Sequence, residues 1–318
     1  FSQETLLSAV VRRGALSPAA IDRFAARIAR FHAEVAVAGA DSRYGTAEAI
    51  WGAVGDNVER LRAHPHEPAL ASRIGALADW TRDTFERLRP AFAERRARGL
   101  VRECHGDLHL GNMILEGDDV VVFDAIEFSE ELRWIDTVSD VAFASMDLRH
   151  RGRPDLANRF ANAWLEASGA YAGLAVWPFY AVYRALVRAK VGEIRLDAEE
   201  GGDGRAALAE DFDAYVALAE QLAAPRRPRL VLTCGPPGSG KTTGTQSMVE
   251  AEGAVRVRSD VERKRLHGLD ALDASDSTTS GGIYDTASTA RTYERLLALA
   301  ETIATAGATA IVDATFLK

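Results

Sequence analysis

Apolar residues in the first hundred positions recur at helical spacing. One set falls three or four residues apart, on one face of an α-helix, and comprises Ile21, Phe24, Ile28, Phe31 and Val35. Ser17 followed by Pro18 is typical of a helix start, because the serine oxygen accepts a backbone N–H and proline fits the first turn. The pattern predicts one helix here and a second from about Ala69 to Arg96.

A break around Pro65 separates the two predicted helices. His64 and His66 flank this proline, and a metal site built on the two histidines is one interpretation. A solvated loop is the other interpretation. We favour the loop, because Glu67 is the one Cys or carboxylate partner at ligand spacing nearby in the sequence.

The pattern changes at Leu100. Two short apolar runs on either side of Gly117 predict a β-hairpin. Further helical patterns follow, from about Trp134 to Arg149, Pro154 to Ser168, Trp177 to Leu196 and Arg205 to Ala223. The prolines and arginines of residues 225–229 are typical of a linker.

Beyond the linker, short apolar runs alternate with helical patterns. The runs that predict strands are residues 229–234, 254–260 and 309–315. This alternation predicts a three-layer α/β domain with a parallel sheet. We therefore expect an α/β multidomain protein: a mostly helical domain at 1–224, the linker at 225–229 and the α/β domain at 230–318.

Composition narrows the expected partners and compartment. The chain is 47% hydrophobic and 26% charged, as in soluble globular proteins, and its net charge of −8 argues against nucleic acid or a membrane surface held by charge alone. We do not expect the residues from Phe1 to form a signal peptide. Cys104 and Cys234 each end an apolar run, so we expect buried packing residues in a reducing, cytoplasmic setting and no disulfide.

A glycine-rich motif follows the first predicted strand of the second domain. It fits G-x-x-x-x-G-K-[ST] and consists of Gly235, Pro236, Pro237, Gly238, Ser239, Gly240, Lys241 and Thr242, with Thr243 next. Its glycines let backbone N–H groups converge on phosphate oxygens at a helix N-terminus. Lys241 is expected to reach the β- and γ-phosphates of a nucleotide, and the Thr242 hydroxyl to bind Mg²⁺. A plain strand-to-helix turn is the alternative, which the loop, lysine, threonine and flanks together disfavour.

Three further residues complete this candidate site. Asp260 ends the second predicted strand and Arg263 lies three residues on, so both can face one pocket. The acid can accept a hydroxyl proton and the arginine can hold an anion. The alternative is an N-cap Asp before a charged helix face. Asp313 ends the third predicted strand, where a P-loop protein holds Mg²⁺.

The first domain carries a second set of polar residues. His105-Gly106-Asp107 is followed by Asn112, and the predicted hairpin ends in Asp124. An Asp and an Asn five residues apart in one tight loop can supply a base and a metal ligand, and Asp124 can return beside them as a second ligand. The alternative is that Asp107 and Asp124 cap turns.

These residues resemble the aminoglycoside-phosphotransferase group of the protein-kinase-like fold, whose H-G-D-x-x-x-x-N motif is met in full. The resemblance implies a kinase-like large lobe over 1–224, with Asp107 as catalytic base, Asn112 and Asp124 as metal ligands and His105 as organiser of the loop. The family also has a smaller lobe with a strand lysine and a helix glutamate, and nothing before His105 resembles its strands.

The same resemblance makes Asp136 and Asp140 supports of the loop or parts of an acceptor pocket. The second domain resembles the small P-loop kinases related to adenylate, gluconate and polynucleotide kinases, because the D-x-x-R pattern at Asp260 and the strand-end Asp313 both match. The whole chain resembles a fused bacterial protein in which an aminoglycoside-phosphotransferase-like domain precedes a P-loop kinase domain.

Both ends of the chain are interpreted as cuts. The chain begins with Phe1 in place of Met, and Lys318 directly follows an apolar run typical of an interior strand. We expect a longer native protein, with a strand-rich lobe upstream and a further strand and an arginine-bearing lid downstream. Without them we expect weak catalysis, because an open site leaves the transferring group in water.

The expected function is ATP- and Mg²⁺-dependent phosphoryl transfer to a hydroxyl of a small molecule: a sugar, amino-sugar, aminoglycoside or nucleoside. A different enzymatic interpretation places all chemistry in the P-loop domain, on a nucleic-acid 5′ end, with the first domain selecting the substrate. The non-enzymatic interpretation is an ATP-dependent switch. Nucleotide and acceptor are thus the expected partners, and no membrane partner is expected.

Overall fold

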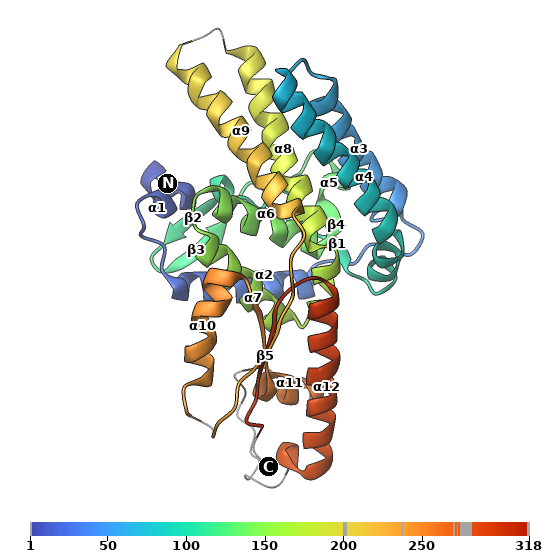
Figure 1. Cartoon of the computed structure of the whole chain (residues 1–318), viewed down its shortest axis with the longest axis vertical. Helices are drawn as coiled ribbons and strands as arrows, with labels where there is room; N and C mark the ends of the chain where they lie inside the picture. The colour runs from blue at the N-terminus through green and yellow to red at the C-terminus, as the bar shows by residue number, and fades with distance from the viewer. Residues whose placement is uncertain are drawn as a thin grey trace. The chain divides into compact units, whose positions relative to one another are not determined.

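A computed structural model describes residues 2–199, 202–236, 238–269, 271, 273 and 282–316. The chain forms two compact units, and Figure 1 labels their α-helices and the strands β1 to β5. One unit comprises Phe1–Arg153 and Ala175–Ala224, and the other comprises Pro154–Leu174 and Pro225–Lys318. The segment Pro154–Leu174, which the sequence-based division places in the first domain, therefore packs in the second unit.

The first unit is mostly helical. Its helices, with 3₁₀ turns marked η, are η1 (Gln3–Thr5), α1 (Leu7–Arg12), α2 (Pro18–Glu34), α3 (Ala47–Ala63), α4 (Pro68–Ala97), η2 (Leu110–Asn112), α5 (Glu130–Arg133), α6 (Thr137–His150), α8 (Trp177–Ala198) and α9 (Asp203–Ala223). Its strands are β1 (Val101–Glu103), β2 (Met113–Glu116), β3 (Asp119–Val122) and β4 (Trp134–Asp136). Strands β2 and β3 pair antiparallel, so the predicted hairpin is confirmed, and β1 pairs antiparallel with β4.

Helix α6 lies at the centre of the first unit, because every residue from Thr137 to Leu148 is buried. Helices α8 and α9 run antiparallel and pack together, and α3 and α4 form a second pair that packs on them (Figure 1). Phe85, Phe92 and Phe179 meet between α4 and α8, with ring centroids 5.2–6.2 Å apart. This core holds α6 and the loops at its start in place.

Helix α2 confirms the first helix that the sequence pattern predicts. The Ser17 hydroxyl oxygen accepts a hydrogen bond from the Ala20 backbone N–H at 3.2 Å, and Pro18 begins the helix. The predicted apolar positions Ile21 and Phe24 are buried, with 0% and 2% of their surface exposed. Burial of this face stabilises the helix far more than its intrinsic propensity.

The predicted helix from Trp134 to Arg149 begins later than expected, and its first residues form β4. Asp136 causes the change. Its carboxylate caps α6 by accepting the Val138 N–H at 2.8 Å, and it also binds both Nε and Nη2 of Arg95 at 2.6 and 2.7 Å. An Asp that caps a helix has extended backbone angles, so the preceding residues are free to pair with β1.

The buried Arg95–Asp136 pair gives a stability prediction. Asp136→Asn is expected to lower the free energy of unfolding of the first unit by about 3–5 kcal/mol, because it leaves the buried Arg95 guanidinium without its counter-charge. Denaturant titration followed by circular dichroism measures the change. Arg23→Ala is the matched control: Arg23 pairs with Asp119 at 2.9 Å but both side chains are half exposed, so the loss is about 1 kcal/mol or less. Equal losses in the two variants would contradict the prediction.

The second unit is an α/β unit. Its helices are α7 (Pro154–Ser168), η3 (Tyr171–Ala175), α10 (Lys241–Glu252), α11 (Ser259–Leu266), η4 (Gly282–Tyr284) and α12 (Thr286–Thr305). Its strands are β5 (Leu230–Leu232), β6 (Val255–Arg258) and β7 (Ala310–Asp313). Within the described residues they form a parallel sheet in the order β5-β7-β6, which confirms the predicted parallel sheet. Val249, Ala254 and Ile311 form a buried cluster between α10 and the sheet.

Helix α7 binds the free edge of β6. The Asn162 side-chain oxygen accepts the backbone N–H of Arg256 on β6 at 2.7 Å, and the Asn158 amide donates to the Glu250 carbonyl on α10 at 2.7 Å. The polar groups of an edge strand need such partners when they are covered. Helix α7 therefore belongs to the second unit by hydrogen bonding as well as by packing.

Strand β5 differs from its prediction as a buried strand. Leu230 and Leu232 are 57% and 55% exposed. Strand β5 lies at the edge of the described sheet, and residues two apart share a face, so both leucines lie on a face that the described residues leave open. Cys234, expected to be buried, is exposed, whereas Cys104 is buried, and both are free thiols.

No helix among the described residues has the length and apolar content that a membrane span requires.

Candidate active site

The glycine-rich loop of the second unit leads from β5 into α10. Gly240 is the N-cap of α10 and has a φ of 78°, a left-handed conformation that glycine adopts without a Cβ clash. Lys241 is the first helical residue, and its Nζ donates to the carbonyl oxygens of Gly235 and Pro236 at 3.0 and 2.8 Å. The ammonium group therefore lies across the loop at the helix N-terminus. Pro237 lies outside the described residues.

Thr242 and Asp313 form the candidate metal-binding pair of this loop. The Thr242 hydroxyl donates to the Asp313 Oδ2 at 2.6 Å, and the Thr233 hydroxyl donates to the other oxygen at 3.0 Å. Asp313 is at the end of β7 and only 6% exposed. A hydroxyl and a carboxylate are the oxygen ligands that Mg²⁺ prefers, so this pair fits the ion.

One pocket of about 540 Å³ joins the loop to the acid and arginine predicted from sequence. Its polar lining includes Lys241, Thr242, Asp260, Arg263 and Asp313. These residues come from α10, α11 and β7, which meet where parallel strands end. The structure therefore brings these five predicted residues together around one cavity.

Asp260 and Arg263 differ in their freedom. Asp260 is exposed and accepts a hydrogen bond from the Tyr284 hydroxyl at 3.1 Å. Arg263 is 8% exposed and donates to the Ile283 carbonyl at 3.0 Å, with its guanidinium over the Tyr284 ring. The N-cap alternative for Asp260 is wrong, because Arg258 occupies the cap of α11 and Asp260 lies in the first turn. Asp260 is thus available to an incoming hydroxyl, whereas Arg263 is fixed in the wall.

The sequence prediction missed Arg258, which also lines this pocket. Its Nε and Nη2 donate to the two oxygens of Glu166 on α7 at 2.7 and 2.6 Å. Burial lowers the pKa of Arg258, but the hydrogen bonds and charge of Glu166 outweigh it and raise that pKa above its ordinary value. A strand-end arginine two residues before Asp260 is a weak signal in the sequence, and nothing local indicates Glu166.

In the first unit, the His105-Gly106-Asp107 loop follows β1. Gly106 has a φ of 84°, and a Cβ there would lie 2.5 Å from the Leu132 carbonyl oxygen, so the turn requires glycine. The His105 ring Nε2 lies 2.9 Å from the Phe123 carbonyl oxygen. His105 therefore ties this loop to the end of the β2–β3 hairpin.

Asp107 is held by its neighbours in the loop. Its Oδ2 accepts a hydrogen bond from the Asn112 Nδ2 at 2.9 Å and lies 3.3 Å from the His109 Nε2. Burial raises the pKa of Asp107, but the hydrogen bond and charge of His109 outweigh it and lower that pKa below its ordinary value of 3.8. Asp107 is therefore an ionised carboxylate at neutral pH, as an acceptor of a hydroxyl proton must be.

Asp124 follows the hairpin on the Asn112 side. The Phe123 N–H donates to the Asn112 carbonyl at 3.0 Å, so the backbone of Asp124 lies one residue from that of Asn112. Asp124 is exposed and has a φ of 60°, which is uncommon for a residue other than glycine and occurs often at functional sites. The hairpin thus returns the second predicted metal ligand next to the first.

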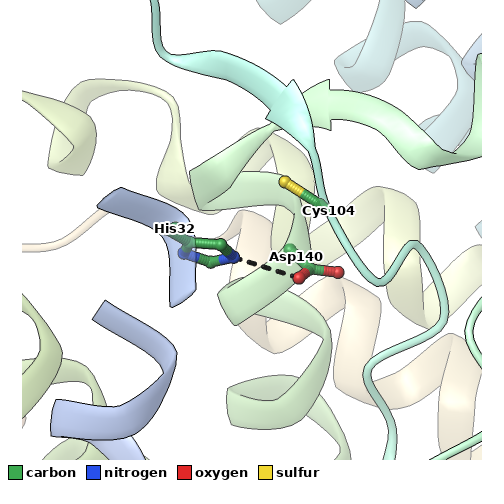
Figure 2. A group of neighbouring side chains, drawn as sticks. All are labelled: His32, Cys104 and Asp140. Carbon is green, nitrogen blue, oxygen red and sulfur yellow. Dashed lines mark hydrogen bonds and ion pairs between the residues drawn. The ribbon is translucent and has the colours of Figure 1, made fainter. Parts of the chain in front are cut away.

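Asp140 holds the His105-Gly106-Asp107 loop through hydrogen bonds to its backbone. Its two oxygens accept the His105 and Gly106 backbone N–H groups at 3.3 and 3.0 Å, and one oxygen also lies 3.1 Å from the His32 ring Nε2. Figure 2 shows His32 of α2 and Asp140 of α6 pointing toward each other, with Cys104 beside them. Burial raises the pKa of the Cys104 thiol well above its usual range, so it is a neutral packing group. The sequence prediction missed His32.

Asp136 supports the neighbouring β4–α6 junction. Both Asp136 oxygens are bound by Arg95, and one of them also caps α6. Of the two predicted roles for Asp136, loop support is therefore the one the geometry favours.

Asp140 gives a pH prediction. Burial raises its pKa, but the hydrogen bond and charge of His32 outweigh it and lower that pKa below 3.8. A carboxyl group whose pKa falls on folding contributes stability above its unfolded pKa and loses it as pH falls through the folded value. Asp140→Asn is therefore expected to be destabilised at pH 7 and to lose less further stability than the parent below pH 3.8. Denaturant midpoints measured across this range test it, and parallel pH profiles would contradict it.

The fold and these two sets of residues define a protein that joins a phosphotransferase-type unit to a P-loop unit. Residues 4–177 match the Phosphotransferase enzyme family, and residues 230–318 match an AAA domain. The first match covers more than half of the chain, so the protein belongs to the phosphotransferase enzyme family. The predicted order of a phosphotransferase-like domain followed by a P-loop domain is confirmed.

The chain is 28% identical over 310 residues to an uncharacterized protein of Mycobacterium bovis and to uncharacterized proteins of two strains of Mycobacterium tuberculosis. The match covers 98% of this chain but spans only 61% of the length of these curated relatives. Among solved structures, the chain is similar to an ethanolamine kinase of Plasmodium vivax, with a TM-score of 0.43 and 12% identity over 67% of this chain and 61% of that chain.

Proposed function

We propose that the protein is an ATP- and Mg²⁺-dependent phosphotransferase that transfers a phosphoryl group to a hydroxyl of a small molecule. The observation that carries this proposal is the pocket of the second unit. There the P-loop Lys241, the Thr242–Asp313 pair and the exposed acid Asp260 line one cavity. Phosphoryl transfer needs few chemical groups beyond a phosphate-binding loop, a pair of metal ligands and a proton acceptor.

Each side chain has a role in this proposal. The loop N–H groups and Lys241 bind the nucleotide phosphates, and Asp260 accepts the proton of the acceptor hydroxyl. Arg263 is too firmly held to move with the reacting group, so it provides a fixed positive charge in the wall. Thr242 and Asp313 would hold Mg²⁺, and the bound ion neutralises charge on the phosphates.

The first unit contributes a second base in this proposal. Asp107 is ionised and accepts a hydrogen bond from Asn112. Because the Asn112 Nδ2 faces Asp107, the Asn112 Oδ1 is directed away from it. Asn112 and Asp124 would hold Mg²⁺ there. The acceptor class that both units serve is a polyhydroxyl compound: a sugar, an amino-sugar, an aminoglycoside or a nucleoside.

A labelled-transfer experiment tests the proposal. The whole chain is incubated with ATP labelled in the γ-phosphate, with and without Mg²⁺, and with a panel of sugars, amino-sugars, aminoglycosides, nucleosides and a 5′-hydroxyl oligonucleotide. Mg²⁺-dependent label on a small hydroxyl acceptor is expected. Label on the oligonucleotide alone would move the acceptor to nucleic acid, and ATP binding without transfer to any acceptor would replace the enzyme by a nucleotide-dependent switch.

A further inference from the structure

Two histidines and a glutamate of the first unit meet away from both candidate sites. His64 is the C-cap of α3, His66 lies two residues on, and Glu193 is on α8. The Glu193 Oε1 lies 3.6 Å from the His64 Nδ1 and 3.4 Å from the His66 Nε2. One ligand atom from each residue lies within 4.8 Å of the other two.

Glu193 is the unusual member of this group. Its side chain is only 2% exposed, yet among the described residues neither of its carboxylate oxygens has a hydrogen-bond partner. A buried carboxylate without hydrogen bonds is costly, and such groups are paired with a cation or bound to a metal. Arg60 is the nearest arginine, but it is half exposed and its Nε lies 4.0 Å from the Glu193 Oε2. It neutralises Glu193 weakly.

The distances from Glu193 Oε1 to the two histidine nitrogens fit a metal ion. Zinc binds imidazole nitrogen and carboxylate oxygen at about 2.0–2.2 Å, so neighbouring corners of a tetrahedron lie about 3.3–3.5 Å apart. The separations of 3.4 and 3.6 Å on Glu193 Oε1 are close to that edge length. Direct hydrogen bonds between the same groups would be shorter, at about 2.7–3.0 Å.

The surroundings of His64 give independent support for a metal site. Its other nitrogen, Nε2, lies 3.0 Å from the Asp197 Oδ1 one turn further along α8. A histidine that binds metal through one nitrogen commonly donates the other N–H to a carboxylate, which fixes its tautomer and orientation. Asp197 also adds a negative charge that offsets Arg60. His66 must release the Leu61 carbonyl, now 2.9 Å from its Nε2, to bind through that atom.

We propose that His64, His66 and Glu193 bind a divalent transition-metal ion such as Zn²⁺, with Asp197 orienting His64 and water in the fourth position. Two imidazoles and one carboxylate suit zinc and its first-row neighbours better than Mg²⁺ or Ca²⁺, which prefer oxygen ligands alone. The ion joins the α3–α4 connection to α8, and because it binds the folded chain it stabilises the first unit.

The described residues contain a second cluster of potential metal ligands, but its carboxylate does not lack hydrogen bonds. It comprises His32, Cys104 and Asp140, all buried. Both oxygens of Asp140 already accept backbone N–H groups of the His105 loop, and burial keeps Cys104 protonated. The carboxylate and the thiol of that cluster are therefore already accounted for.

Metal titration of the untagged whole chain tests the proposal. After treatment with a chelator, the protein is titrated with Co²⁺ and followed by visible absorption, and with Zn²⁺ by calorimetry. We expect one ion per chain, intense Co²⁺ bands typical of four-coordinate geometry, and a higher melting temperature with Zn²⁺. His66→Gln and Glu193→Gln are expected to weaken binding at least about 100-fold, and Asp197→Asn about 10–100-fold.

His150→Gln is the matched control, because His150 pairs with Asp211 at 2.8 Å but belongs to no three-ligand group among the described residues. It is expected to bind Zn²⁺ as the parent does. X-ray absorption on the Zn²⁺-loaded parent reads the ligands directly and needs no variant to fold: nitrogen and oxygen neighbours are expected. Sulfur neighbours, no binding by the parent, or equal affinity in Glu193→Gln and the parent would each overturn the proposal.

Discussion

Replacing Lys241 by alanine is expected to lower phosphoryl transfer at the pocket of the second unit by about 10²–10³-fold in kcat/KM. Its ammonium group lies across the P-loop, 2.8–3.0 Å from the Gly235 and Pro236 carbonyls, and is the lysine that lines this pocket. Without it the backbone N–H groups remain, but the mobile positive charge that follows the transferring phosphoryl group is lost. Calorimetry with Mg²⁺-ATP is expected to show weaker nucleotide binding as well.

Lys190→Ala is the control for this experiment. Lys190 is a half-buried lysine on α8 of the first unit, outside the P-loop pocket, so removing its charge tests for a general effect of losing a lysine. Transfer and ATP affinity are expected to match the parent. If Lys241→Ala retained the ATP affinity and turnover of the parent, the pocket of the second unit would not be the nucleotide site.

Local motifs in the sequence predicted much of both candidate sites. The G-x-x-x-x-G-K-[ST] spacing predicts a loop at a helix start, and Lys241 does begin α10 after the left-handed Gly240. Likewise H-G-D-x-x-x-x-N places Asp107 and Asn112 in one tight loop, where they hydrogen bond. Such patterns succeed because the geometry they require is made within a few residues of backbone.

Interactions between distant segments were not predictable in this way. His32 and Asp140 lie 108 positions apart, and Arg258 and Glu166 lie 92 apart. The packing of the helices decides which carboxylate pairs with which basic side chain, and no local spacing in the sequence encodes that pairing. His64-Pro65-His66 shows the same limit, because Glu193, the carboxylate that lies beside the two histidines, comes from another helix.

Burial was also misjudged where it depends on neighbours. The apolar residues Leu230 and Leu232 predict a strand correctly, but not that its face is open among the described residues. The run from Trp134 predicts a helix, yet pairing of β4 with β1 and the Arg95–Asp136 bond delay the helix to Thr137. Propensity is a weak prior that such tertiary contacts override.

Replacing Asp107 by asparagine is expected to leave the fold intact and lower acceptor phosphorylation by about 10²–10⁴-fold if the first unit supplies the base. Asparagine keeps the size of the side chain but cannot accept the acceptor's proton. Asp124→Asn is expected to raise the Mg²⁺ concentration needed for half-maximal rate, because this residue acts through the metal. Initial rates measured against Mg²⁺ concentration separate the two effects.

Asp118→Asn is the matched control, since Asp118 is an exposed turn residue between β2 and β3, at the opposite end of the hairpin from Asp124. Its rate and Mg²⁺ dependence are expected to equal those of the parent.

The comparison with Lys241→Ala then shows which unit carries out the transfer. If Asp107→Asn and Asp124→Asn both retain transfer and metal dependence while Lys241→Ala loses transfer, the first unit selects the acceptor and the P-loop pocket alone transfers the phosphoryl group. If all three lose transfer, transfer depends on residues of both units.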